Sequence, residues 1–437
     1  MSAAGLTQPS MTSLYQVVRD NPGFRRLYAA NAVSQLGDWL NVVALFSLLL
    51  ELTGKGEAVA LVLVMKLLPA FVVGPAAGVL ADRVSRRAVM VVCDLLRAAL
   101  VLCLLLVHRP QDVPIAYAVM AAHSLASAFF EPAQAATFPN LVPPKDLLLA
   151  GALENALWSM TLALGSILGG LLLAAVSRDA VFLLDAVSFV GSALLLRGLP
   201  DAAARAKTAP KLRDELEALE SERAQGTQGW ANLLGLPDLR EGLRYVFSHR
   251  QVRTLLLAKS GFGLTLGGVL VLLAHFGERE FGHGGGAGIA ALWTARGIGS
   301  FVGPFLAFRL GGSTVPALRR GITFAQLAIL GAYLAFASSP YIWLAALALM
   351  VANAGGSILW TYGSTLLAQI VPDHVRGRVA AAEMGGMTLA MSFSTLTVGH
   401  LLDAGLGARL LMASCALIGL FPIALWRSSL DAPSGAP

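Results

Sequence analysis

Polar and ionisable side chains recur at helical spacing inside segments that are otherwise apolar. The first such segment carries Asn31, Ser34, Gln35, Asp38 and Asn41, whose spacings of 3, 1, 3 and 3 place them along one face of a helix. Asp38 lies about eleven residues into its apolar run, which corresponds to roughly 16 Å of helix. A carboxyl group at that depth in lipid is costly, and it can take up and release a proton. Asp38 is therefore the first candidate for proton coupling, the alternative being a structural hydrogen bond to a neighbouring helix.

Two further segments repeat this arrangement. The members of the first are His123, Ser127, Glu131 and Gln134, and those of the second are Asn353, Ser357, Thr361 and Ser364. Trp360 and Tyr362 add aromatic surface to the second segment. Glu131 is the second candidate for a proton or cation site, or it gates the inner mouth of a pathway. His123 ranks third, because a lone membrane histidine is as often a hydrogen-bond partner between helices. Polar stripes in lipid must face water or protein.

The elements that must position these side chains are apolar runs long enough to cross a bilayer. Hydrophobic residues make up 56% of the 437-residue chain and charged residues only 13%, which is too apolar for a water-soluble domain. Twelve runs each approach the ~20 residues that a spanning helix needs. They fall near 28–52, 58–81, 88–107, 113–138, 150–176, 180–198, 252–276, 287–310, 317–338, 341–368, 378–402 and 406–426. An all-α integral membrane protein with twelve transmembrane helices is predicted.

The basic residues predict how the chain lies in the membrane. Twelve spans put both termini on one side, and that side collects 23 of the 32 Lys and Arg residues. Cytoplasmic loops carry such an excess, so both termini are predicted to be cytoplasmic. The surplus of basic residues over the 26 acidic ones is thus explained without a nucleic-acid partner.

An internal repeat predicts two similar halves. A shift of 229 residues superposes Gly74-Pro75 on Gly303-Pro304, Val142-Pro143 on Val371-Pro372, and Glu154 on Glu383, which favours duplication over chance. The predicted divisions are a cytoplasmic segment 1–27, an N-terminal six-helix half 28–198, a linker 199–250, a C-terminal six-helix half 251–427 and a tail 428–437. The helical spacing of Leu212, Leu216 and Leu219 predicts a surface helix within the linker.

Lys66 and Arg296 occupy equivalent positions of this repeat to within one residue. Both lie inside predicted spans, in the half nearer the outer face. They could pair with an acid or attract an anionic substrate. The alternative is that both side chains extend along the helix toward the outer surface.

A short charged turn between the second and third runs carries the most specific motif. Its residues are Gly78-Val79-Leu80-Ala81-Asp82-Arg83-Val84-Ser85-Arg86-Arg87. A generic positive turn explains the arginines but not Asp82 at the helix end. The motif resembles the loop signature of the major facilitator superfamily, Gly-x-Leu-Ala-Asp-Arg-x-Gly-Arg-Arg, with Ser85 in place of the second glycine. The resemblance implies a facilitator fold whose helices 1, 4, 7 and 10 line a central cavity between the halves.

Further stretches narrow the resemblance to the branch that holds siderophore exporters and macrolide efflux pumps. They are residues 131–143, Glu-Pro-Ala-Gln-Ala-Ala-Thr-Phe-Pro-Asn-Leu-Val-Pro, and residues 239–247 with 253–256. The segment Gly165-Ser166-Ile167-Leu168-Gly169-Gly170 is similar to the antiporter signature Gly-Pro-x-x-Gly-Gly, with Ser166 in place of the proline. Close packing of helices on Gly165 and Gly169 is the structural alternative.

The resemblance also implies a conformational latch, because it places the charged turn beside the start of the eleventh helix. The free backbone N–H groups of that helix start would attract Asp82, and Arg83 and Arg86 would reach acids of the loop charge cluster. These contacts would join the halves only when the cytoplasmic side is closed. The predicted latch residues are Gly78, Asp82, Arg83, Arg86, Arg87, Asp94, Arg97, Glu154 and Glu383.

The sequence lacks a Gly-x-x-x-x-Gly-Lys-Ser/Thr phosphate motif and a zinc-type His/Cys cluster, so ATP hydrolysis and metalloenzyme chemistry are not expected. We predict a secondary active transporter of the bacterial cytoplasmic membrane that exchanges protons for an amphipathic drug or siderophore. It is expected to act as a monomer among membrane lipids, driven by the proton gradient and without a cofactor. The alternatives are a lipid or lysolipid transporter of the same fold, and a non-transporting partner in a membrane complex.

Overall fold

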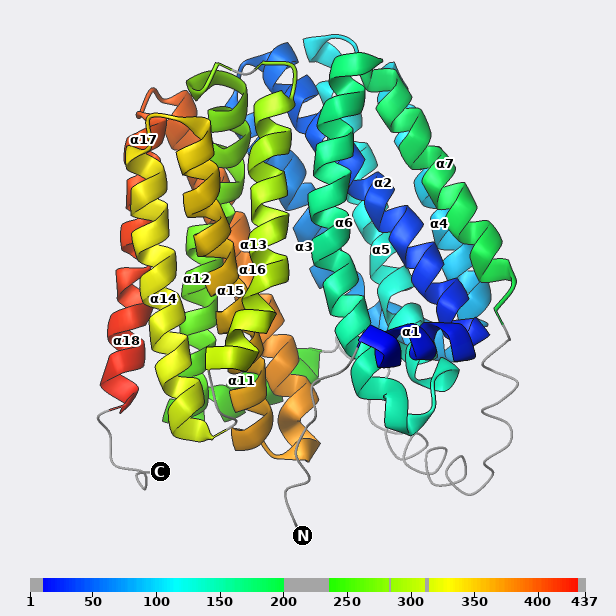
Figure 1. The fold of residues 1–437 in the computed structure, drawn as a ribbon, viewed down its shortest axis with the longest axis vertical. Helices are drawn as coiled ribbons and strands as arrows, with labels where there is room; N and C mark the ends of the chain where they lie inside the picture. The colour runs from blue at the N-terminus through cyan, green and yellow to red at the C-terminus, as the bar shows by residue number, and fades with distance from the viewer. Residues whose placement is uncertain (1–10, 200–235, 283, 311–313, 431–437) are drawn as a thin grey trace.

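The computed structural model describes residues 11–199, 236–282, 284–310 and 314–430, and long α-helices form most of it (Figure 1). Within these ranges, eleven helical segments are long and apolar enough to cross a membrane. The prediction of an all-α, multi-pass membrane protein is therefore confirmed. Helix α16 (Asp373–Asp403) is not among the eleven, so the count of twelve spans and the side on which the termini lie stay predictions.

The N-terminal half consists of long helices that coincide with the predicted apolar runs. They are α2 (Pro22–Thr53), α3 (Gly56–Arg83), α4 (Arg86–Leu102), α5 (Val113–Thr137), α6 (Leu147–Ala175) and α7 (Arg178–Arg197). Helix α2 begins six residues before the expected run, at Pro22, where the missing proline N–H is tolerated at a helix start. Helix α4 continues for one short turn of 3₁₀ helix, Cys103–Leu106, so the third run is covered to its end.

The C-terminal half repeats this organisation with one difference. Its helices are α12 (Arg250–His275), α13 (Ala287–Leu310), α14 (Val315–Ser338), α15 (Ile342–Ile370), α16, α17 (Ala408–Ile418) and α18 (Leu420–Leu430). The last predicted run, 406–426, is divided at Gly419 into α17 and α18. Pro422 follows this glycine, and a proline in the first turn cannot continue the hydrogen bonds of the preceding helix.

Two short helices lie outside this set of long ones. Helix α1 (Met11–Asp20) was not expected from the polar N-terminal segment, and Val17 and Val18 pack it against Phe24 and Val142. Helix α11 (Leu236–Ser248) ends the linker and packs against α12 and α16. The surface helix predicted around Leu212–Leu219 lies outside the described residues. Helices α1, α11 and the end of α18 all lie at the lower end of the bundle in Figure 1, which we call the α1/α11 end.

The two halves meet through close pairs of helices. Helix α6 packs against α13, and α3 packs against α16. A Cβ atom at Gly297 of α13 would come within 2.5 Å of the backbone nitrogen of Ala163 in α6. The two helices therefore touch backbone to backbone, an approach that only a glycine permits.

The end of the bundle opposite α1 and α11 is sealed by contacts between the halves. Asp403 of α16 accepts hydrogen bonds from the backbone nitrogens of Gly56 at 2.7 Å and Glu57 at 3.0 Å. Ser47 of α2 donates to Glu278 at 3.2 Å. Beneath these polar contacts, apolar side chains of both halves form one buried cluster that includes Phe46, Leu270, Ile289 and Trp293.

The charged turn of the motif is short. Helix α3 ends at Arg83 and α4 begins at Arg86, with the Ser85 hydroxyl accepting a hydrogen bond from the Ala88 backbone nitrogen. Ser85, which departs from the family signature, thus serves as the N-cap of α4. The side chains of Asp82 and Arg83 are outside the described part of the chain, as is the surrounding of Gly78.

Candidate functional site

A cavity of about 2250 Å³ lies between the two halves. Its wall comes mainly from α2, α3, α5, α6, α12, α13, α15 and α16. It reaches toward the α1/α11 end, where Leu149 near the start of α6 and Arg309 at the end of α13 line it. In the other direction the lining extends to Phe46 and Leu270, which belong to the buried apolar cluster. The cavity therefore extends toward the α1/α11 end, and the buried apolar cluster borders it at the opposite end.

Almost all of the polar residues predicted for this cavity contribute to its wall. They are Asn31, Ser34, Gln35, Asp38, Lys66, His123, Ser127, Glu131, Gln134, Arg296, Asn353, Ser357, Trp360 and Thr361. Asn41 does not line the cavity, because its amide is directed toward α7 and donates to Asp185 Oδ2 at 2.6 Å. The predicted stripe on α2 therefore ends at Asp38.

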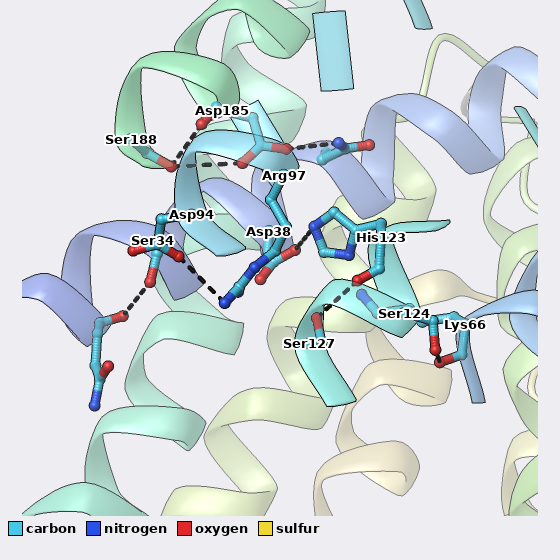
Figure 2. Close-up of polar contacts among 12 residues, drawn as sticks. Ser34, Asp38, Lys66, Asp94, Arg97, His123, Ser124, Ser127, Asp185 and Ser188 are labelled. Atoms are coloured by element: carbon cyan, nitrogen blue, oxygen red, sulfur yellow. Dashed lines mark hydrogen bonds and ion pairs between the residues drawn. The ribbon is translucent and has the colours of Figure 1, made fainter. Parts of the chain in front are cut away.

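Asp38 and His123 meet at the centre of the N-terminal wall. His123 Nε2 lies 3.5 Å from Asp38 Oδ1, and the histidine side chain is only 4% exposed whereas that of Asp38 is 25% exposed (Figure 2). The imidazole also meets the ring of Phe189 edge to face at 5.5 Å. A proton bound by the accessible carboxyl group could pass directly to the buried imidazole or return to the cavity.

Asp94 and Arg97 are not part of a charge cluster at the loop. At 1.5 Å of rise per residue, Arg97 stands roughly 16 Å from the start of α4, inside the N-terminal half. Its Nη2 pairs with Asp94 Oδ1 at 3.2 Å, and Asp94 Oδ2 accepts from the Ser192 hydroxyl at 2.6 Å. The guanidinium lies over the ring of Phe130 at 4.2 Å. Figure 2 shows this pair beside Asp38, so both residues belong to the surroundings of that carboxyl group.

Glu131 and Glu154, two further acids predicted as site residues, have different surroundings. Glu131 of α5 is exposed on the cavity wall. Glu154 of α6 accepts hydrogen bonds from Asn31 Nδ2 at 3.3 and 3.5 Å. Glu154 therefore has a partner inside its own half of the molecule, not across the interface.

The C-terminal half contains a buried ion pair, Lys259–Glu383, that the sequence analysis did not predict. Glu383 of α16 was placed with the latch, but it pairs with Lys259 of α12, and both side chains are buried. Lys259 Nζ also donates to Ser364 at 3.3 Å and lies 4.3 Å from the ring centroid of Trp360. Lys259 lies inside the predicted apolar run 252–276, and a charge at that place was the signal that could have identified it.

Asp185 of α7 is an acid that the sequence analysis missed. It is fully buried, and it accepts from Asn41 Nδ2 and, at 3.5 Å, from the Ser188 hydroxyl. A single acid in the middle of an apolar run was again the available signal. Figure 2 shows Asp185 near Asp38 and Asp94, on three different helices of the N-terminal half.

Two arginines of the predicted latch, Arg86 and Arg87, donate hydrogen bonds to backbone carbonyls of the N-terminal half. Arg86 Nη1 donates to Ala136 at 2.9 Å, and Arg87 Nη1 donates to Leu199 at 3.1 Å. The predicted latch acids have other partners in this structure. Asp94 contacts Arg97 and Ser192, Glu154 accepts from Asn31, and Glu383 pairs with Lys259. The latch itself is not tested by these contacts.

Comparison with known proteins identifies the family. A family model described as Major Facilitator Superfamily matches residues 27–382. An uncharacterized MFS-type transporter of Bacillus subtilis, YkuC, is 27% identical over 256 residues, which are 58% of this chain and 56% of the relative. Macrolide efflux protein A of Streptococcus pyogenes is 28% identical over 199 residues, 45% of this chain and 47% of the relative. The matches thus span about half the length of these relatives.

Longer matches support the same fold. An uncharacterized MFS-type transporter of Mycobacterium tuberculosis is 27% identical over 85% of this chain and 82% of its own length. Among solved structures, the nucleoside transporter NupG superposes with a TM-score of 0.65 at 14% identity, covering 94% of this chain and 99% of that one. At this identity the likeness to NupG concerns the fold alone.

Proposed function

The chain belongs to the Major Facilitator Superfamily, and we propose that it is a proton-coupled exporter of amphipathic small molecules such as drugs or siderophores. It is a multi-pass membrane transporter of that superfamily and not an enzyme. The proposal adds the bacterial cytoplasmic membrane, twelve spans with α16 as the eleventh, cytoplasmic termini, and a monomer driven by the proton gradient. The partial likeness to macrolide efflux proteins supports the direction of transport.

One observation carries the proposal: an accessible carboxylate beside a buried histidine on the wall of a cavity large enough for a medium-sized molecule. Asp38 faces the cavity, His123 lies 3.5 Å behind it, and the cavity measures about 2250 Å³. A proton on Asp38 removes a negative charge from the same space that the substrate enters. Protonation of Asp38 and binding of the substrate would therefore change each other's affinity, because both occur at the same wall of the cavity.

The proposed cycle alternates access between the two ends of the bundle. With the termini in the cytoplasm, the present structure is an inward-facing state whose outer end is closed by Asp403, Ser47 and Glu278. Outward opening would break these contacts and close the α1/α11 end. Asp82 on the charged turn would then attract the N-terminus of α16.

The test is transport by purified protein in proteoliposomes loaded with a pH-sensitive dye. A panel of amphipathic drugs, siderophores and lysolipids is presented with and without a pH gradient. We expect substrate movement to be driven by the gradient and to carry protons with it. Asp38→Asn should bind substrate and exchange it across a membrane without a gradient, yet lose gradient-driven accumulation, because the amide hydrogen-bonds but does not titrate.

A matched control is Asp20→Asn, which makes the same change in an exposed side chain of α1. This variant should transport like the original protein. Gradient-driven accumulation that is unchanged in Asp38→Asn would exclude the coupling role. Transport of lysolipid alone would favour the alternative substrate class.

A further inference from the structure

Three tryptophans form a continuous aromatic cluster on the wall of the cavity. The ring centroid of Trp39 lies 5.8 Å from that of Trp158 and 5.8 Å from that of Trp293. Trp39 and Trp158 belong to α2 and α6 of the N-terminal half, whereas Trp293 belongs to α13 of the C-terminal half. All three line the cavity, and Trp158 is 41% exposed. We call these three residues the tryptophan cluster.

Two cations flank the tryptophan cluster, one from each half. The Arg296 guanidinium lies 5.0 Å from the ring centroid of Trp293 and 5.7 Å from that of Trp158. The Lys66 ammonium lies 5.5 Å from the ring centroid of Trp39. Both residues line the cavity. Ring faces attract cations, so the tryptophans fix the two charges at the cavity wall.

Arg296 differs from the other buried cations in having no acid. Arg97 is paired with Asp94, and Lys259 is paired with Glu383. Among the described residues, no carboxylate forms an ion pair with Arg296 and no acceptor takes a hydrogen bond from it, although only 8% of the residue is exposed. The neighbouring Trp293 Nε1 donor is also buried without an acceptor in the described part of the chain.

A buried guanidinium without an acceptor is costly to keep, because desolvation is not offset by paired hydrogen bonds. Arg296 is anchored on two rings and fully charged at any physiological pH. What the site lacks is a negative group that accepts hydrogen bonds. A ligand entering the cavity can supply one.

We propose that Arg296 and the tryptophan cluster bind an anionic, flat substrate, with its carboxylate or comparable acidic group on Arg296 and its conjugated ring system against Trp158 and Trp39. The proposal rests on the proposed transport function and adds the substrate class. Lys66 supplies a second positive charge against the ring of Trp39. Conjugated acids are favoured over amines of the same shape, because an amine would meet two cations.

The position of the tryptophan cluster makes ligand binding depend on the spacing between the two halves. Its rings come from both halves, and Arg296 lies one helical turn from Trp293 on α13. A ligand held by both halves binds most strongly to the state in which they have this spacing. Substrate binding would therefore depend on the inward-facing arrangement.

Direct binding tests this without any gradient. Three probes of one shape are compared on the purified full-length protein in detergent: 1-pyrenebutyrate, 1-pyrenebutanol and 1-pyrenebutylamine. Energy transfer from tryptophan to pyrene reports occupancy of the cavity. We expect the carboxylate probe to bind about tenfold more tightly than the alcohol, and the amine to bind most weakly, since a charge-assisted contact is stronger than a neutral one.

The matching variants are Arg296→Gln, Arg296→Lys and Arg309→Gln. Arg296→Gln should weaken the binding of pyrenebutyrate about tenfold and leave the binding of pyrenebutanol nearly unchanged. Arg296→Lys should keep part of the preference for the carboxylate probe over the alcohol. Arg309→Gln removes an exposed positive charge near the α1/α11 end of the cavity. It should change the affinity for pyrenebutyrate by less than about threefold, because exposed charges are screened.

Equal binding of the three probes by the original protein, or tighter binding of the amine, would overturn the proposal even if Arg296→Gln does not fold. So would an equal loss in Arg296→Gln and Arg309→Gln. Correct probe selectivity without any transport in proteoliposomes would leave this inference standing and refute the proposed export. The two proposals can therefore fail separately.

Discussion

The Lys259–Glu383 pair offers a quantitative test of how the C-terminal half is held together. It joins α12 to α16, and the side chains are 2% and 7% exposed. Lys259 keeps two further contacts, the Ser364 hydroxyl at 3.3 Å and the Trp360 ring at 4.3 Å. Glu383 has Lys259 as its one ion-pair partner within the described residues.

Removing one partner of a buried pair typically costs about 3–5 kcal/mol, because a desolvated charge is left uncompensated. Lys259→Met and Glu383→Gln should each lower stability by an amount in this range. Glu383→Gln should be the milder change, because Ser364 and Trp360 still contact the ammonium. The double variant Lys259→Met/Glu383→Leu removes both charges, and its stability should return close to that of the original protein.

The assay is the thermal unfolding temperature of the detergent-purified protein, compared at one heating rate because large membrane proteins often unfold irreversibly. The matched control is the exposed Arg178–Glu51 pair, with side chains 26% and 61% exposed. Its variants Arg178→Met and Glu51→Leu should each change stability by less than about 1 kcal/mol. A double Lys259/Glu383 variant that unfolds at a lower temperature than both single variants would refute this reasoning.

Two further predictions concern the movement of the halves. Gly297→Ala should lower the unfolding temperature and slow transport, because its Cβ would overlap the Ala163 backbone of α6, at a cost of about 1–3 kcal/mol. Gly331→Ala is the control, since nothing lies within 4 Å of its added Cβ; equal effects of the two changes would contradict the packing argument. Asp82→Asn should shift the population toward the inward-facing state by about 1–3 kcal/mol and slow turnover with near-normal expression. Spin-label distances between the α1/α11 ends of α3 and α16 should report this shift, and distances identical to those of the original protein would rule out the latch.

The charges of α4 and α16 show where sequence reasoning was misled. Asp94 and Arg97 were grouped with the loop because the nearby turn is rich in arginine, although they lie two to three turns into α4. Glu383 was grouped with the same turn because it lies near the start of the predicted eleventh helix, which the family resemblance places beside that turn. Asp94 also accepts from Ser192, and Glu383 pairs with Lys259. Both of these partners are about a hundred or more residues away in the chain, and no local pattern indicates them.

The sequence by itself determined the helices and the faces they present. Span length and the spacing of polar residues are local properties, so α2, α5 and α15 carry Asp38, Glu131 and Asn353 on the cavity side as expected. The resemblance of the charged turn was enough to assign the family.

Only the tertiary structure decided which charges meet. The pairing of Asp38 with His123, and of Lys259 with Glu383, depends on the rotation and depth of helices that are distant in sequence. The same is true of Arg296, whose lack of an acid among the described residues is evident only when its neighbours are known. A charge inside the membrane-spanning part is costly because its surroundings are apolar. The packing of the helices determines which partner offsets this cost.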